Sequence, residues 1–121
     1  MARIRTIKPS FWTDAGLTAC SIQARLLAVG LISFADDEGR FVAAPGAILG
    51  YVFPLDSTVT PAKVKAWRAE LERRGLIEVY VIDGFEYGHW PNWKRHQVIN
   101  RPRPSTFPSP GLFSDESGSV Q

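Results

Sequence analysis

The segment from Thr60 to Trp90 constrains the fold of this 121-residue chain more than any other. Thr60 can accept a backbone N–H of a first helical turn, and Pro61 is already set for the first helical position. Gly75 can adopt the left-handed conformation that ends a helix. A β-hairpin is predicted next, with strands at 76–82 and 85–90 around a turn at Asp83-Gly84. The sequence therefore predicts a capped helix that leads directly into a hairpin.

The elements predicted ahead of this helix define the fold class. Ser21 is expected to cap the longest helix, which runs from Ile22 to about Asp36 and is apolar on nearly every side. A brief strand at Phe41-Val42 follows, and then a helix from Pro45 to Val52. Helix, strand, helix, helix and hairpin make an α+β fold, a winged helix-turn-helix. Its three-helix core carries a C-terminal β-hairpin wing.

The length fits one domain with a short tail. We expect residues 1–102 to form the domain, with an N-terminal strand at Met1–Thr6, a helical turn near Lys8–Trp12 and a basic C-terminal extension. Residues 103–121 are rich in proline and serine and are expected to be a flexible tail. One cysteine and two histidines provide neither a disulfide nor zinc-ligand spacing, so we expect no metal and no cofactor.

The Thr60 helix has two distinct faces. Val64, Trp67 and Leu71 share the face expected to pack on the core. The opposite face is small and basic: Ala62, Ala66, Ala69 and Arg73, flanked by Lys63 and Lys65. A helix of this kind can lie deep in a major groove while its cations contact phosphates. The same alanine face could instead pack against a helix of a partner.

Two features outside this helix bear on nucleic-acid binding. Lys94, Arg95, Arg101 and Arg103 follow the hairpin and are candidates to hold a phosphate backbone. Trp90 and Trp93 are interleaved with them, so they could stack single-stranded bases or simply close the apolar edge of the domain. The hairpin itself is acidic at Asp83 and Glu86. We therefore expect the wing to complete the core rather than grip phosphate, through Ile77, Val79, Val81, Phe85 and Tyr87.

The adjacent carboxylates of Asp36, Asp37 and Glu38 are of the type that binds magnesium. Adjacent residues at a helix end point in different directions, however, and we expect a loop paired with Arg40 or the N-terminal arginines. The sequence contains neither a glycine-rich phosphate loop nor a nucleophile motif, so an enzyme is not expected. The N-terminus lacks the apolar core of a signal peptide, and the longest apolar run is too short and polar for a bilayer.

Four segments together resemble a known family. They are Arg5–Trp12 (RTIKPSFW), Ala35–Arg40 (ADDEGR), Glu70–Ile77 (ELERRGLI) and His96–Pro102 (HQVINRP). The chain from about Arg3 to Pro108 thereby resembles the N-terminal winged-helix domain of bacteriophage replication initiation proteins, which are described as replisome organisers or as DnaD-like. The third segment is common among winged helices, whereas the first and last are more specific. The resemblance implies binding to origin DNA and recruitment of a helicase or its loader by a further C-terminal region.

These observations lead to one expected function and two alternatives. We expect a non-enzymatic DNA-binding protein of a bacteriophage, linked to replication initiation, in the cytoplasm of the bacterial host. Its expected partner is double-stranded DNA, with single-stranded DNA as a further candidate and no membrane. The alternatives are a phage transcriptional regulator and a protein-interaction module. That module would form a homodimer or bind a replication or host protein through the alanine face or the long apolar helix.

Overall fold

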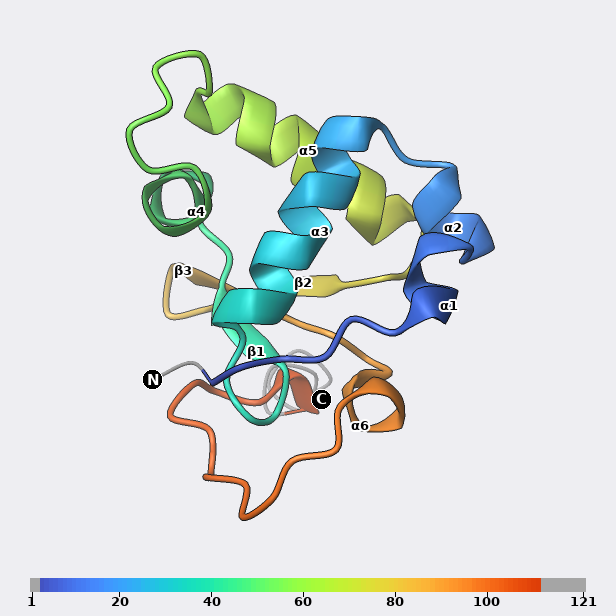
Figure 1. The fold of residues 1–121 in the computed structure, drawn as a ribbon. Helices are drawn as coiled ribbons and strands as arrows, with labels where there is room; N and C mark the ends of the chain where they lie inside the picture. The colour runs from blue at the N-terminus through green and yellow to red at the C-terminus, as the bar shows by residue number, and fades with distance from the viewer. Residues whose placement is uncertain (1–2, 112–121) are drawn as a thin grey trace.

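The computed structural model describes residues 3–111 and has an α+β fold (Figure 1). Within this range six helices accompany a three-stranded antiparallel sheet of order β1-β3-β2. The helices are α1 (Pro9–Trp12), α2 (Ala15–Thr18), α3 (Ile22–Phe34), α4 (Pro45–Val52), α5 (Pro61–Arg73) and α6 (Trp93–His96). The strands are β1 (Arg40–Val42), β2 (Glu78–Ile82) and β3 (Phe85–His89).

The local signals in the sequence set the ends of the main elements as predicted. Ser21 Oγ accepts the Ala24 N–H at 3.1 Å, and Thr60 Oγ1 accepts the Lys63 N–H at 3.2 Å. Gly75 ends α5 with a φ of 69°. The hairpin turns at Asp83-Gly84, where both residues have positive φ, 54° and 81°. Positive φ at both central residues is the type I′ geometry that matches the twist of the two strands.

Helix α3 is the centre of the helical layer and packs against α4 and α5 (Figure 1). Its buried side is formed by Ala24, Leu27, Ala28, Leu31 and Ile32. Gly30 allows α4 to approach closely, because a Cβ there would lie 2.6 Å from Val52 Cγ1. Part of the apolar surface of α3 stays exposed, at Ile22, Leu26 and Phe34. None of the helices in residues 3–111 combines the length and apolarity needed to cross a membrane.

The sheet has a different covering on each face. Phe41 of β1 is buried in the core on the helix side and lies against Gly88 of β3, where a Cβ would come within 2.5 Å of the Phe41 ring. On the other face the Tyr87 ring lies 5.9 Å from the Phe107 ring, and Tyr80 Oη donates to Pro108 O at 2.7 Å. The C-terminal part of the described chain therefore covers the face of the sheet that points away from the helices.

This covering differs from the flexible tail expected to begin at residue 103. Arg103 N donates to Asp37 Oδ2 at 2.9 Å, and the Ser105 hydroxyl donates to the Asp36 carboxylate. Arg40 Nη1 donates to Phe107 O at 3.0 Å. Residues 103–111 are thus held by contacts with segments far away in the sequence. Residues 112–121 of the expected tail lie outside the described residues.

The N-terminal strand predicted at Met1–Thr6 is not present in its described part, since residues 3–8 have neither helix nor strand structure. Met1 and Ala2 lie outside the described residues. The backbone of Thr6 is bonded to the Gln97 side chain instead of to a neighbouring strand. Thr6 N donates to Gln97 Oε1 at 3.0 Å, and Gln97 Nε2 donates to Thr6 O at 2.7 Å. One amide side chain satisfies the two backbone groups that a sheet ladder would have used.

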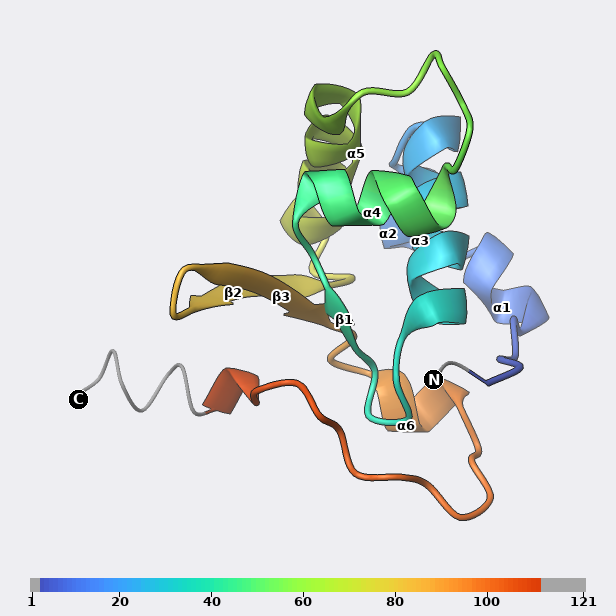
Figure 2. The same ribbon diagram turned by 90° about the vertical axis from the view of Figure 1, so that its left-hand side faces the viewer.

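The predicted contribution of the hairpin to the core is correct for Ile77 and Val79 and wrong for two other residues. Val81 is 46% exposed and Phe85 is 66% exposed. Both flank the turn, where the hairpin projects beyond the helical layer (Figure 2). Tyr80 and Ile82 are buried instead.

Candidate nucleic-acid interface

Helix α5 is fixed to the core along the predicted side. Val64 and Leu71 are fully buried, and the Trp67 ring packs on Phe53 with ring centroids 5.6 Å apart. On the opposite face Ala62 and Ala66 are exposed and Ala69 is half-buried. The solvent-facing side of α5 therefore carries small side chains. A major groove of DNA or a helix of another protein could approach it closely.

Arg68 has a structural role that was not predicted from the sequence. Its side chain is 7% exposed, and Nη1 donates to Ala43 O at 2.6 Å and to Glu86 Oε2 at 3.0 Å. Arg68 Nε also lies 3.3 Å from Glu72 Oε2. The sequence did contain an indication of this role. Arg68 lies four residues after Val64 and three before Leu71, so all three share the helix face that packs on the core. This cation therefore joins α5 to the hairpin and is not a candidate for DNA contact.

The carboxylates around α5 are used in contacts within the protein. Glu70 accepts from Ser21 N at 2.7 Å and from Ser21 Oγ at 2.8 Å, which ties α5 to the start of α3. Glu72 and Glu86 both pair with Arg68. Glu86, which we expected to make the hairpin tip acidic, therefore points back to α5, and Asp83 remains exposed at the tip.

The candidate cations of α5 all reach solvent. Lys63, Lys65 and Arg73 are exposed, and the Lys63 ammonium donates to Thr58 O at 2.7 Å. Glu72 and Glu86 pair with Arg68 on the inward side, so the exposed cations of this face are Lys63, Lys65 and Arg73. A surface of small residues bordered by exposed cations can approach a phosphate backbone without a steric or electrostatic barrier.

The second group of candidate cations lies elsewhere. Lys94 and Arg95 are exposed on α6, and Arg101 and Arg103 are exposed in the loop that follows. Figures 1 and 2 show α5 at one end of the ribbon, and α6 with this loop at the other. The structure does not bring the two predicted basic groups together on one surface.

The Trp93 indole belongs to the core and cannot stack exposed bases. It is 4% exposed, its Nε1 donates to Asp37 O at 2.9 Å, and the Arg5 guanidinium lies 5.2 Å from its ring centroid. Trp93 therefore closes the apolar edge of the domain, which was the alternative to single-strand stacking. Trp90 is half-buried and packs against the same core.

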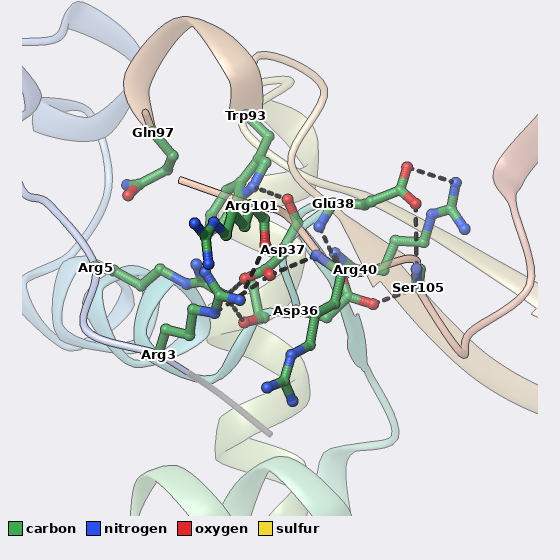
Figure 3. A network of polar contacts seen from close by, with 12 residues as sticks. Arg3, Arg5, Asp36, Asp37, Glu38, Arg40, Trp93, Gln97, Arg101 and Ser105 are labelled. Atoms are coloured by element: carbon green, nitrogen blue, oxygen red, sulfur yellow. Dashed lines mark hydrogen bonds and ion pairs between the residues drawn. The ribbon is translucent and has the colours of Figure 1, made fainter. Parts of the chain in front are cut away.

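Asp37 is the centre of the polar network that anchors this end of the molecule (Figure 3). Its carboxylate accepts from Arg103 N and from Arg5 Nη2, the latter at 3.0 Å, and lies 3.4 Å from Arg3 Nε. The bond from the Arg103 backbone lowers the pKa of Asp37, and the two arginines lower it further against the opposing effect of burial. The predicted pairing of the Asp36–Glu38 loop with the N-terminal arginines and with Arg40 is confirmed.

Within the part of the chain that the structure describes, no three His, Cys, Asp or Glu side chains gather where a metal ion could be held. Cys20 is buried, its thiol lies 3.4 Å from Gly16 O, and burial raises its pKa. A buried thiol with a raised pKa is a poor nucleophile.

Comparison with known proteins adds no relative to this description. No protein-family model, no curated protein and no solved structure matches the chain.

Proposed function

We propose that this chain is a winged-helix protein that binds duplex DNA through α5. The observation that carries the proposal is the two-sided character of α5. One side is fixed by Val64, Arg68 and Leu71, while the other presents exposed alanines between Lys63, Lys65 and Arg73. The order α3, β1, α4, α5, β2, β3, with β3 between the other two strands, is the order expected of a winged helix-turn-helix.

The biological setting we propose is replication initiation in a bacteriophage, as the sequence resemblance implies. Transcriptional regulation in a bacteriophage is the alternative, and it would use the same DNA contacts. The hairpin would flank the helix without gripping phosphate, because its tip carries Asp83 and the exposed side chains of Val81 and Phe85. The cations of α6 and the loop after it lie at the other end and would not touch the same stretch of straight duplex.

The test is the salt dependence of duplex binding. Affinity for a duplex labelled with a fluorophore should fall steeply as salt rises, because phosphate contacts release counterions. Changing Lys63, Lys65 and Arg73 to alanine should weaken binding and flatten the log–log salt slope by about 0.9 for each phosphate that is no longer neutralised. Changing Lys94, Arg95 and Arg103 to alanine removes the same number of exposed cations from the other end of the molecule and serves as the matched control. Absence of binding to duplex at low salt would contradict the proposal.

A protein-interaction module is the second candidate, and the exposed apolar side chains of α3 favour it. Ile22 is 76% exposed, Leu26 is 58% exposed and Phe34 is 49% exposed. Light scattering on dilute protein separates the two functions. Two results together would favour the protein-interaction module over DNA binding. They are a stable dimer that the Leu26→Asp change dissociates, and no binding to duplex DNA.

A further inference from the structure

The part of the chain that includes α6 and the loop after it is strongly basic. Residues 87–111 contain no aspartate and no glutamate. Their cationic side chains, which we call the α6 basic end, are all exposed: Lys94, Arg95, Arg101 and Arg103. Exposed cations that are not interspersed with carboxylates produce a positive potential and attract a polyanion.

The carboxylates that contact the loop after α6 bind its backbone and leave its arginine side chains unpaired. Asp37 is buried and accepts from Arg103 N at 2.9 Å. Asp36 accepts from the Ser105 hydroxyl, and Glu38 accepts from Ser105 N at 3.2 Å. Among the described residues, neither guanidinium of this loop forms an ion pair. Both therefore remain available to a ligand.

The backbone of this loop is fixed by one buried carboxylate and one arginine. Arg3 Nη1 donates to Asn100 O at 2.9 Å, and Arg3 Nη2 donates to Arg101 O at 3.1 Å. Arg3 Nε also lies 3.4 Å from Asp37 Oδ2, the atom that accepts from Arg103 N (Figure 3). The loop is thus attached to the domain through its main chain, while its arginine side chains extend into solvent.

Arg101 adopts an unfavourable backbone conformation. Its φ is 54°, in the left-handed region that residues with a Cβ rarely occupy. It also precedes Pro102, and a residue before proline prefers an extended backbone. Such conformations persist where the surrounding contacts impose them, and they are found most often at binding sites. The contacts from Arg3 impose this one, so the exposed Arg101 side chain is presented at a cost in stability.

The chemistry of this end favours the phosphate backbone of duplex DNA. A guanidinium binds phosphate with two parallel hydrogen bonds. Prolines on both sides of Arg103 stiffen the loop, which reduces the entropy lost on binding. Binding of single strands relies on aromatic side chains that stack bases. The Trp93 indole is buried and Trp90 is half-buried, so the segment offers no such platform.

We infer that the α6 basic end is a second site for duplex DNA, so that one copy of this chain holds two duplex segments at once. The inference rests on the proposed binding of a first duplex by α5. Figures 1 and 2 show α5 and α6 at opposite ends of the ribbon, so the two duplexes would not compete for one surface. The second site is the weaker one, because its loop contacts phosphates whereas a helix can also enter a groove.

The experiment is a bridging assay with the whole chain. One short duplex is immobilised on beads and saturated with protein, and unbound protein is washed away before a second, fluorescent duplex is added. The unchanged protein should capture the fluorescent duplex at low salt and release it as salt rises. Absence of protein on the immobilised duplex would contradict the proposed function. Protein bound to that duplex without capture of the second one would overturn the inference alone.

Variants of the loop arginines test the site itself. Changing Arg101 and Arg103 to alanine should reduce capture about tenfold, because two charge-assisted contacts are lost. Binding to the immobilised duplex should change by less than about twofold. Changing both to lysine keeps the charge and should retain most of the capture. Arg74→Ala removes one exposed arginine outside both sites and is the matched control for Arg101→Ala. Unaltered capture in the double alanine variant would overturn the inference.

Two other ways of capturing the second duplex have their own tests. A dimer could hold two duplexes through two copies of α5, so the stoichiometry of the complex is measured by analytical ultracentrifugation. We expect one copy of the chain with two duplexes, and two copies with two duplexes would overturn the inference. A fluorescent single strand should be captured poorly. Capture of the single strand as efficient as that of the duplex would also overturn it.

Discussion

Asp37 shows how a single buried carboxylate can organise segments that are far apart in the sequence. Its carboxylate accepts hydrogen bonds from the Arg5 side chain and the Arg103 backbone and pairs with Arg3. Residues near both ends of the described chain therefore meet at one side chain. A buried ion pair brings little net stability when it is complete. The loss of one partner is costly, because the other charge then remains buried alone.

Asp37→Asn should therefore lower the free energy of unfolding by about 3 kcal/mol at neutral pH, because Arg5, with a side chain only 3% exposed, loses its counter-charge. Asp83→Asn, the same change at an exposed turn, should stay within about 0.5 kcal/mol. Chemical denaturation followed by circular dichroism gives both values. If Asp37→Asn and Asp83→Asn lowered the free energy of unfolding equally, burial of the Asp37–Arg5 pair would not be the cause of the loss.

The pH dependence follows from the lowered pKa of Asp37 in the folded state. A lowered folded-state pKa stabilises the fold fully above the unfolded-state value of about 3.9, and this stabilisation is lost as the pH falls through the folded-state pKa. The stability difference between the protein and Asp37→Asn should thus be largest near neutral pH and should shrink below about pH 4. Thermal unfolding across this pH range tests it. A difference that grew in acid would show that the ionised Asp37 carboxylate is not the stabilising form.

At the scale of the elements, the cations of α5 divide into two kinds by burial. Arg68→Met should lower the free energy of unfolding by about 2 kcal/mol, since it leaves Ala43 O and Glu86 without their donor. Lys65→Met removes the same charge from an exposed site and should cost no more than about 0.5 kcal/mol. Urea titrations of the two variants make the comparison. A larger loss for Lys65→Met would contradict the inward role of Arg68.

The C-terminal segment on the sheet is a second element-scale case. Phe107→Ala should cost about 1–2 kcal/mol of unfolding free energy, because it uncovers Tyr87 and removes a half-buried ring. Burial raises the pKa of Tyr80 to about 12, and the variant should bring that pKa back toward 10. Near-ultraviolet absorbance during alkaline titration reports the shift. Thr106→Ala, an exposed neighbour, should change neither quantity, and an unmoved Tyr80 in Phe107→Ala would show that the segment does not bury it.

These elements show which parts of the fold were predictable. Ser21, Thr60 and the Asp83-Gly84 turn act on their own neighbours, and their helices and hairpin were predicted correctly. The Arg3–Thr6 segment has the composition of a strand, but a side chain about ninety residues away occupies its backbone. The packing of residues 103–111 likewise depends on carboxylates and tyrosines that no local pattern connects to them.

The candidate site was predictable to a similar degree. The alanine face and its flanking lysines followed from helical periodicity, which is local. Whether an arginine on that helix points inward depends on Ala43 and Glu86, which come from other elements. The cavity lined by Phe11, Ile32 and Trp90, among other residues, forms only where separate parts of the chain meet, so no local pattern in the sequence could indicate it.

At the scale of the whole molecule, the separation of the two basic groups makes a prediction about DNA length. Interactions between exposed charges are largely screened beyond about 8 Å at physiological salt. A short duplex seated on α5 should therefore not sense Lys94 and Arg95, which lie at the other end of the molecule (Figure 2). On such a duplex, changing both to alanine should alter affinity by less than about twofold, since independent sites that are far apart do not couple.

The paired measurement is the triple change of Lys63, Lys65 and Arg73 on the same short duplex, where the proposed binding through α5 predicts a large loss of affinity because its phosphate contacts are removed. Fluorescence anisotropy at one fixed salt concentration compares the two variants directly. Equal losses would mean that the duplex bends around the molecule, and a larger loss for the Lys94 and Arg95 variant would move the DNA contact to α6. If the α6 pair matters only on a longer duplex, the two ends hold separate segments of one DNA molecule.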